Sequence, residues 1–70
     1  MLPITMAAPG DTVLIKRIAG KDEMRRHLNE LGLVEGDHIK VIQNNSGNII
    51  LQVKEGRIAI DEKAAMRIQY

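Results

Sequence analysis

A short helix followed by two glycine turns is encoded in residues 22–37, which read DEMRRHLNELGLVEGD. Met24, Leu28 and Leu31 lie at positions i, i+4 and i+7, so on a helix they form one apolar stripe. Polar residues fill most of the positions between them. This pattern predicts a short amphipathic helix over Asp22–Leu31, with its apolar stripe packed on a core.

Both ends of this predicted helix carry recognisable signals. Asp22 and Glu23 place negative charge in the first turn, where unpaired N–H groups favour it. Gly32 follows the last apolar position and predicts the left-handed residue that ends many helices. The apolar Leu33 can then fold back on Leu28, as in a Schellman motif.

The segments on both sides of the helix alternate apolar and polar residues and are rich in isoleucine and valine. Both properties are typical of strands. Turn-forming residues separate the segments: the polar run 44–48 predicts an exposed loop, and Glu55-Gly56 predicts a hairpin turn. In the last segment, Met66 and Ile68 are expected to point inward. The predicted strands are 12–18, 38–42, 49–54, 57–60 and 66–69, with a single helical turn at 61–65.

The composition narrows the fold class. The chain has 70 residues, 44% of them hydrophobic, with no cysteine and a single aromatic residue, Tyr70. This length predicts one domain, residues 1–70, with an aliphatic core and no disulfides or thiolate metal sites. Short strands protect their edges best when the sheet closes on itself. We therefore expect a mainly β fold, a small closed or nearly closed barrel of about five strands with one short α-helix inserted after the first strand.

Charge and hydropathy argue against several function classes. Ten Lys and Arg against nine Asp and Glu give a net charge of +1, far from the basic excess typical of binding to phosphate backbones. No apolar run approaches the roughly 20 residues that span a bilayer, and residues 1–10 lack the pattern of a secretory signal. We expect a cytoplasmic protein that does not insert directly into a membrane and does not bind nucleic acid.

The side chains that could perform chemistry are few and dispersed. His27 and His38 are eleven residues apart without a cysteine companion, which matches no metal motif. His27 is expected at the helix surface near Glu23 and Glu30, and His38 at a solvated edge position. No nucleophile elbow or phosphate-binding loop is present, and the paired carboxylates are sequence neighbours at predicted turns. The sequence therefore predicts no catalytic residue, no metal site, no cofactor and no enzyme activity.

A small surface at the helix is the best candidate for binding a partner. Arg25 and Arg26 form the cationic pair of the helix, and Leu33 and Val34 are an apolar pair at its exit. These four residues are the predicted partner-binding residues. Two structural explanations of these residues stay open beside a role in partner binding. The arginines could belong to a solvated helix face, and Leu33 could be a buried part of the Schellman motif.

Several short motifs follow one another in a specific order along the chain: Pro9-Gly10, Ile18-Ala19-Gly20, Arg26–Leu33, Glu35–Ile39 and Val53–Ile60. In this order they resemble the FeoA family of ferrous-iron transport proteins, over about residues 4 to 70. The resemblance implies an SH3-like small barrel without catalysis of its own. It also implies a partner, a FeoB-type membrane GTPase transporter of Fe(II).

Two further interpretations remain beside this adaptor role. The opening strand resembles that of nucleic-acid-binding small β-barrels of ribosomal or transcription-factor type, although exposed aromatic platforms for stacking bases are missing from the sequence. A barrel with a spare edge can also pair strands across a two-fold axis and form a homodimer.

Overall fold

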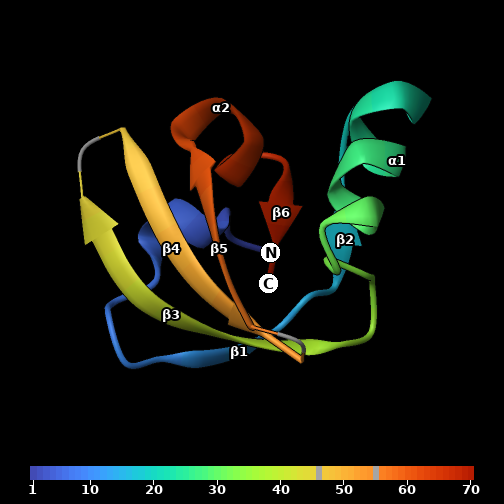
Figure 1. Cartoon of the computed structure of the whole chain (residues 1–70). Coiled ribbons are helices and arrows are strands. Elements are labelled where there is room, and N and C mark those ends of the chain that lie inside the picture. The colour runs from blue at the N-terminus through green and yellow to red at the C-terminus, as the bar shows by residue number, and fades with distance from the viewer. Residues whose placement is uncertain (46, 55) are drawn as a thin grey trace.

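A curved four-stranded sheet and a separate two-stranded sheet enclose the core, with one helix at the side (Figure 1). This arrangement is seen in a computed structural model, which describes residues 1–45, 47–54 and 56–70. Two short helical segments accompany the sheets, the 3-10 turn η1 and the single-turn helix α2. The elements in chain order are η1 (Ile4–Met6), β1 (Thr12–Leu14), β2 (Arg17–Ile18), α1 (Asp22–Glu30), β3 (His38–Asn45), β4 (Asn48–Val53), β5 (Gly56–Asp61), α2 (Glu62–Ala65) and β6 (Ile68–Gln69).

The larger sheet has the strand order β1-β3-β4-β5, and all its neighbours are antiparallel. β2 pairs with β6 in the smaller sheet. The mainly β prediction is confirmed, with one more strand than expected. The larger sheet ends at β1 and β5, so in the described residues its strands do not form a closed ring.

The predicted first strand, residues 12–18, is in fact two strands in different sheets. The backbone N–H of Ile15 donates to the carbonyl of Asp37 at 2.9 Å, beside β3. The next N–H, on Lys16, donates to the carbonyl of Gln69 at 2.8 Å, in β6. The chain therefore crosses from one sheet to the other between these two residues, where no turn-forming residue marks the change.

The polar run 44–48 is also different from its prediction. Asn44 and Asn45 belong to β3, while Ser46 lies outside the described residues. The Asn44 side chain is half-buried, because its amide donates to the carbonyls of Thr5 at 3.0 Å and Ala7 at 2.8 Å. Asn44 therefore ties β3 to the N-terminal segment and does not belong to an exposed loop.

The other predicted strands are close to the observed ones. Asp61 caps α2 as its side chain accepts a hydrogen bond from the N–H of Ala64 at 2.8 Å, which confirms the predicted helical turn. Met66 is wrongly predicted to point inward, since it lies in the turn after α2 and is 54% exposed. Glu55, predicted in the hairpin turn, lies outside the described residues.

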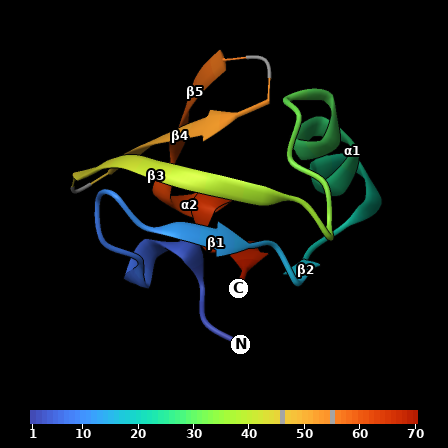
Figure 2. The ribbon, with the colours of Figure 1, turned by 90° about the horizontal axis from the view of Figure 1, so that it is seen from below.

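The core is aliphatic and draws on every part of the chain. The N-terminal segment contributes Ile4 and Ala7, which no periodic pattern indicates. Figure 2 shows the two termini on the same side of the molecule, where the N–H of Leu2 donates to the carbonyl of Tyr70 at 2.9 Å and the reverse bond is 2.8 Å. The large residues that are most completely buried include Ile4, Ile15, Leu28, Leu33, Val41, Ile49, Leu51 and Ile68.

Candidate partner-docking site at the exit of the helix

Helix α1 has the predicted position and orientation. It begins after Lys21, whose carbonyl accepts a hydrogen bond from the N–H of Arg25 at 3.1 Å, and it ends at Glu30. Leu28 is fully buried, and Met24 and Leu31 are half-buried against the core. The apolar stripe therefore holds the helix on the sheets, as its spacing predicts.

The helix ends in a complete Schellman motif. Gly32 has a φ of +96°, and its N–H donates to the carbonyl of Asn29 at 3.0 Å. The N–H of Leu33 donates to the carbonyl of Leu28, also at 3.0 Å, and the Leu33 side chain is fully buried. A Cβ at Gly32 would make only an ordinary contact of 3.5 Å with Val53, so the backbone conformation is what requires glycine.

Burial therefore removes the Leu33 side chain from the predicted partner surface. The Schellman interpretation, which the sequence left open, accounts for this residue. Val34 is different, because 44% of its surface is exposed. The two neighbours thus have opposite roles, one in the core and one on the surface.

The loop that carries Val34 is held by hydrogen bonds at several points. The N–H of Gly36 donates to the carbonyl of Ile15 at 2.8 Å, and the N–H of Asp37 donates to the carbonyl of Val34 at 3.1 Å. Glu35 accepts a hydrogen bond from the N–H of Ile18 through its Oε2 atom at 2.8 Å. Val34 is thus an apolar side chain presented on a loop fixed to both sheets.

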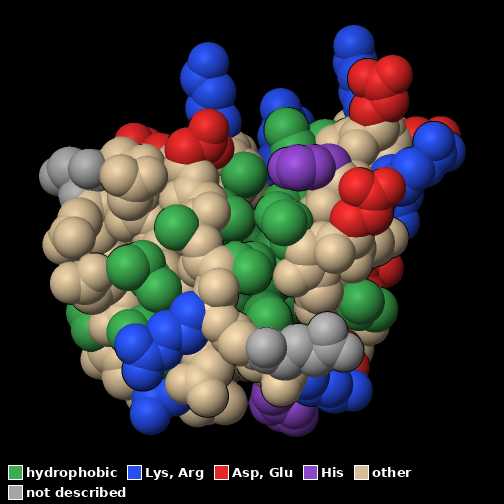
Figure 3. All heavy atoms as spheres, in the orientation of Figure 1, with side chains coloured by type: hydrophobic (Ala, Val, Ile, Leu, Met, Phe, Trp, Pro, Cys, Tyr) green, Lys and Arg blue, Asp and Glu red, His purple; other side chains and the backbone are tan. Residues whose placement is uncertain are grey.

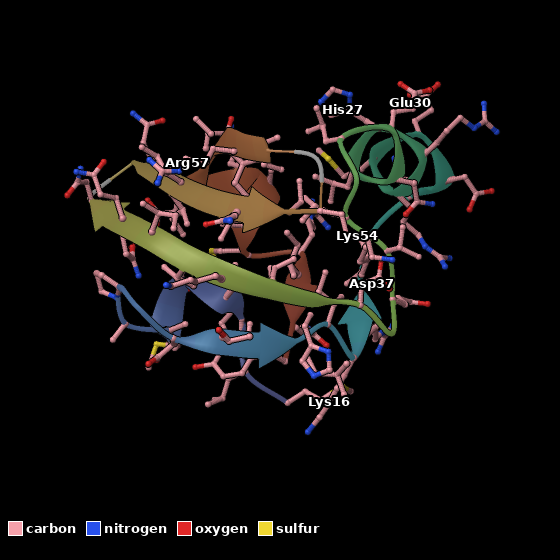
Figure 4. The ribbon with its side chains drawn as sticks, turned by 60° about the horizontal axis from the view of Figure 1, so that its bottom comes forward. Lys16, His27, Glu30, Asp37, Lys54 and Arg57 are labelled. Atoms are coloured by element: carbon pink, nitrogen blue, oxygen red, sulfur yellow. The ribbon has the colours of Figure 1, made fainter. Side chains whose placement is uncertain are left out.

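A hollow of about 240 Å³ lies beside Val34, which we call the exit hollow. Its apolar residues come from the helix end and from the β4–β5 hairpin, and its rim is charged. Figure 4 shows Glu30 on α1, with Lys54 and Asp37 on the segments next to it. The residues that line the exit hollow are Glu30, Leu31, Gly32, Val34, Asp37, Val53 and Lys54.

Val53 and Lys54 are the parts of this site that sequence reasoning missed. They lie about twenty residues after Val34 in the chain, and no local pattern connects the two segments. The contact arises because the end of β4 lies beside the helix end, where the Val53 side chain comes close to Gly32. The only local trace of it is the half-buried Val53 at the end of an alternating strand.

Arg25 and Arg26 are both exposed, as predicted, but they do not line the exit hollow. At about 100° per residue, Arg26 lies roughly 160° around the helix from Leu28, on the solvent side. The site consists of two surfaces, the exit hollow and the exposed side of α1 that carries Arg25 and Arg26. A partner that touches both must extend around the helix.

Neither histidine belongs to a cluster of metal-ligand type. His27 is exposed on α1, and His38 is exposed at the start of β3. His38 pairs with Leu14 of β1, and the pairing of β3 with β4 begins only at Lys40, so His38 lies at a solvated edge position as expected. Among residues 1–45, 47–54 and 56–70, no three His, Asp or Glu side chains are placed to hold a metal ion. The helices in this part of the chain are too short and too polar to cross a membrane.

Comparison with known proteins adds the family context. Residues 2–69 match the family model described as the FeoA domain. The chain is 39% identical over 69 residues to a Methanocaldococcus jannaschii protein with the provisional name Fe(2+) transport protein A, an alignment that covers 97% of this chain and 83% of the relative. Similar solved structures share the fold, which confirms the expected SH3-like β domain.

Two of these structures illustrate the range of proteins with this fold. A crystal structure of an iron uptake regulatory protein (FeoA) has a TM-score of 0.89 and 32% identity, with 96% of this chain and 91% of that chain covered. A manganese-dependent transcriptional repressor has a TM-score of 0.86 and 20% identity, with 94% of this chain and 38% of the repressor covered. The repressor shows a likeness of fold alone.

Proposed function

This chain belongs to the FeoA family, and we propose that it is an accessory protein of ferrous-iron transport that binds the GTPase portion of a FeoB-type membrane transporter of Fe(II). The match to the family model over residues 2–69 carries the proposal. The names of two relatives, which refer to Fe(2+) transport and iron uptake, agree with it. The protein would act in the cytoplasm by contact with its partner and without catalysis of its own.

The surface at the exit of α1 supports a role in protein contact. Val34 is apolar and half-exposed, and the loop that carries it is tied to the carbonyl of Ile15 by a backbone hydrogen bond and to the N–H of Ile18 by the carboxylate of Glu35. A fixed apolar side chain loses little conformational entropy on binding, which favours its use as an anchor. We place the contact at the exit hollow, with Arg25 and Arg26 as cationic side chains that steer an acidic partner surface.

An NMR titration tests this proposal directly. Isotope-labelled protein is titrated with the soluble GTPase portion of the transporter, with and without guanine nucleotide. We expect chemical-shift changes at Val34, Lys54 and the exposed side of α1, together with a change in nucleotide release by the GTPase. Val34→Ser should weaken binding by about fivefold to tenfold, because the lost apolar contact corresponds to about 1–1.4 kcal/mol.

Matched controls separate this site from the rest of the surface. Met66→Ser removes an apolar side chain that is 54% exposed but lies after α2, so it should leave binding unchanged. Arg26→Glu should slow association, whereas Lys40→Glu, the same charge change on β3, should not. Absence of shifts at saturating GTPase, or equal effects of the control variants, would contradict the proposal.

The nucleic-acid alternative receives no support from the described surface. Tyr70, the single aromatic residue, is half-buried beside the N-terminal segment. Base stacking needs exposed aromatic side chains. Salt-dependent binding to RNA or duplex DNA would be the result that revives this alternative.

A further inference from the structure

Strand β5 has a free edge. It is the outer strand of the four-stranded sheet and pairs only with β4 over Gly56–Asp61. Within the described residues, no backbone hydrogen bond outside that pairing reaches β5. β1, at the other end of the sheet, is three residues long, whereas β5 has six. Free edges are usually protected by proline, by charged side chains, lysine above all, or by a bulge. β5 has no proline, lysine or bulge, and its charged residues are the oppositely charged Arg57 and Asp61.

An open space lies next to this edge. A hollow of about 280 Å³ separates β5 from α1. Figure 3 shows a band of hydrophobic side chains on this face of the molecule, between the sheet and the helix. The half-buried Met24 and Leu31 line this hollow. The hollow is lined by Met24, His27, Leu28 and Leu31 on one side and by Ala59, Ile60, Asp61 and Ala64 on the other.

The sequence of β5 is complementary to itself. We propose that a second copy of this chain pairs its own β5 with this edge, antiparallel, across a two-fold axis at Ala59. In this register Arg57 lies opposite Asp61 of the second copy, and the symmetry repeats the pair. Ile58 lies opposite the second copy's Ile60. Each of the residues 57–61 thus lies opposite a residue of matching chemistry in the second copy.

The faces of the strand agree with this register. Arg57, Ala59 and Asp61 are exposed on the outer face of the sheet, whereas Ile60 is buried and Ile58 half-buried on the inner face. An axis at Ile58 or Ile60 would place a charged residue opposite Ala59. An axis between two residues would place outer-face residues opposite inner-face ones. Charge and burial therefore select the axis at Ala59.

The charged partners are placed to meet across the edge. Asp61 is held at the end of the strand, because its Oδ1 atom accepts the hydrogen bond from the N–H of Ala64 at 2.8 Å. Its Oδ2 atom stays available to a second guanidinium group. Arg57 is exposed on the outer face of the sheet, as Figure 4 shows, so its side chain can turn toward the edge. Pairing of one short strand buries a small area, so the dimer should depend on concentration.

Cysteine crosslinking tests the register. The chain has no cysteine, so Ala59→Cys introduces one thiol at the proposed axis. Directly opposite Cα atoms in an antiparallel pair are about 4.5–5.5 Å apart, within the range that a disulfide spans. Mild oxidation should therefore convert Ala59→Cys to a covalent dimer. The control Gln52→Cys lies on β4 opposite Arg57, on the same exposed face but one strand away, and should stay monomeric.

Sedimentation of the full chain provides an independent test. The average mass of the unmodified protein should rise from monomer toward dimer between micromolar and millimolar concentration. Arg57→Glu should abolish this rise, because it faces the second copy's Asp61 with a like charge. Lys40→Glu makes the same charge change on central β3 and should dimerise normally. Circular dichroism confirms that each variant is folded.

Three results would overturn the proposal. The first is an Ala59→Cys protein that crosslinks no faster than Gln52→Cys. The second is a mass that stays monomeric throughout the series, and the third is a mass that rises equally for Arg57→Glu and Lys40→Glu. None of these results bears on binding of the GTPase at the exit hollow, so this proposal and the proposed function succeed or fail separately.

Discussion

Replacing Leu33 by alanine distinguishes a core role for this residue from a surface role. Leu33 is fully buried, and its N–H closes the Schellman motif on Leu28. Leu33→Ala keeps that backbone bond but deletes three carbon atoms from the core. Such substitutions cost about 2–5 kcal/mol, because apolar burial is lost and a cavity remains. Val34→Ala, at an exposed neighbour, should change stability by less than about 0.5 kcal/mol.

The expected loss in the free energy of unfolding is large for a chain of this size. At about 0.05–0.15 kcal/mol per residue, 70 residues give a free energy of unfolding of about 3.5–10 kcal/mol. Urea denaturation followed by circular dichroism measures the loss as a lower midpoint at unchanged slope. The Tm should fall by about 8–40 °C, because each kcal/mol corresponds to about 4–8 °C in a small domain. If Leu33→Ala unfolds the protein fully, Leu33→Met, at less than about 1.5 kcal/mol, still allows the comparison.

A loss below about 1 kcal/mol for Leu33→Ala would refute this reasoning. It would mean that the side chain is not packed in the core. Equal losses for Leu33→Ala and Val34→Ala would do the same. A Leu33→Ala protein of normal stability that no longer binds the GTPase would instead support the prediction from sequence that Leu33 is a partner-binding residue.

Three further substitutions test the contacts that hold the fold. Gly32→Ala should cost about 1–2 kcal/mol in urea denaturation, because φ is +96° there; Gly32→Asn should cost less, and equal stability of all three proteins would contradict the motif. Asn44→Ala leaves the carbonyls of Thr5 and Ala7 without their donor and should cost about 1–3 kcal/mol, with faster hydrogen exchange in the N-terminal segment as the diagnostic sign. Asp61→Ala removes the cap of α2 and should cost about 1 kcal/mol, whereas Asp61→Asn should retain most of the stability; a reversed order would argue against capping.

Local patterns were sufficient for most of the elements. The i, i+4, i+7 spacing of Met24, Leu28 and Leu31 correctly placed α1, because a helix of this type forms from neighbours in sequence. The glycine after Leu31 correctly indicated the Schellman motif. Alternation correctly indicated β3, β4 and β5, although their ends differ by up to three residues.

The wrong predictions concern residues whose position is decided by contacts with residues far away in the chain. No turn-forming residue interrupts the predicted strand at Ile15 and Lys16, yet the backbones of these two residues bond to different sheets. Asn44 looks like a loop residue by its type, but its amide meets carbonyl groups 37 and 39 residues earlier in the chain. Met66 continues an alternating pattern and is still exposed, because it lies in the turn after α2 and not in strand β6.

The candidate sites divide in the same way. The sequence by itself determined the residue types, the exposed arginines of α1, the capping glycine and the motifs that place the chain in the FeoA family. Only the tertiary structure decided that Leu33 is buried while Val34 is exposed, that Val53 and Lys54 complete the exit hollow, and that β5 has the free edge. The local backbone conformation of a helix or turn depends on neighbours a few residues away, so it can be predicted from the sequence. Which surface remains uncovered depends on how segments far apart in the chain pack together, and that exists only in the folded molecule.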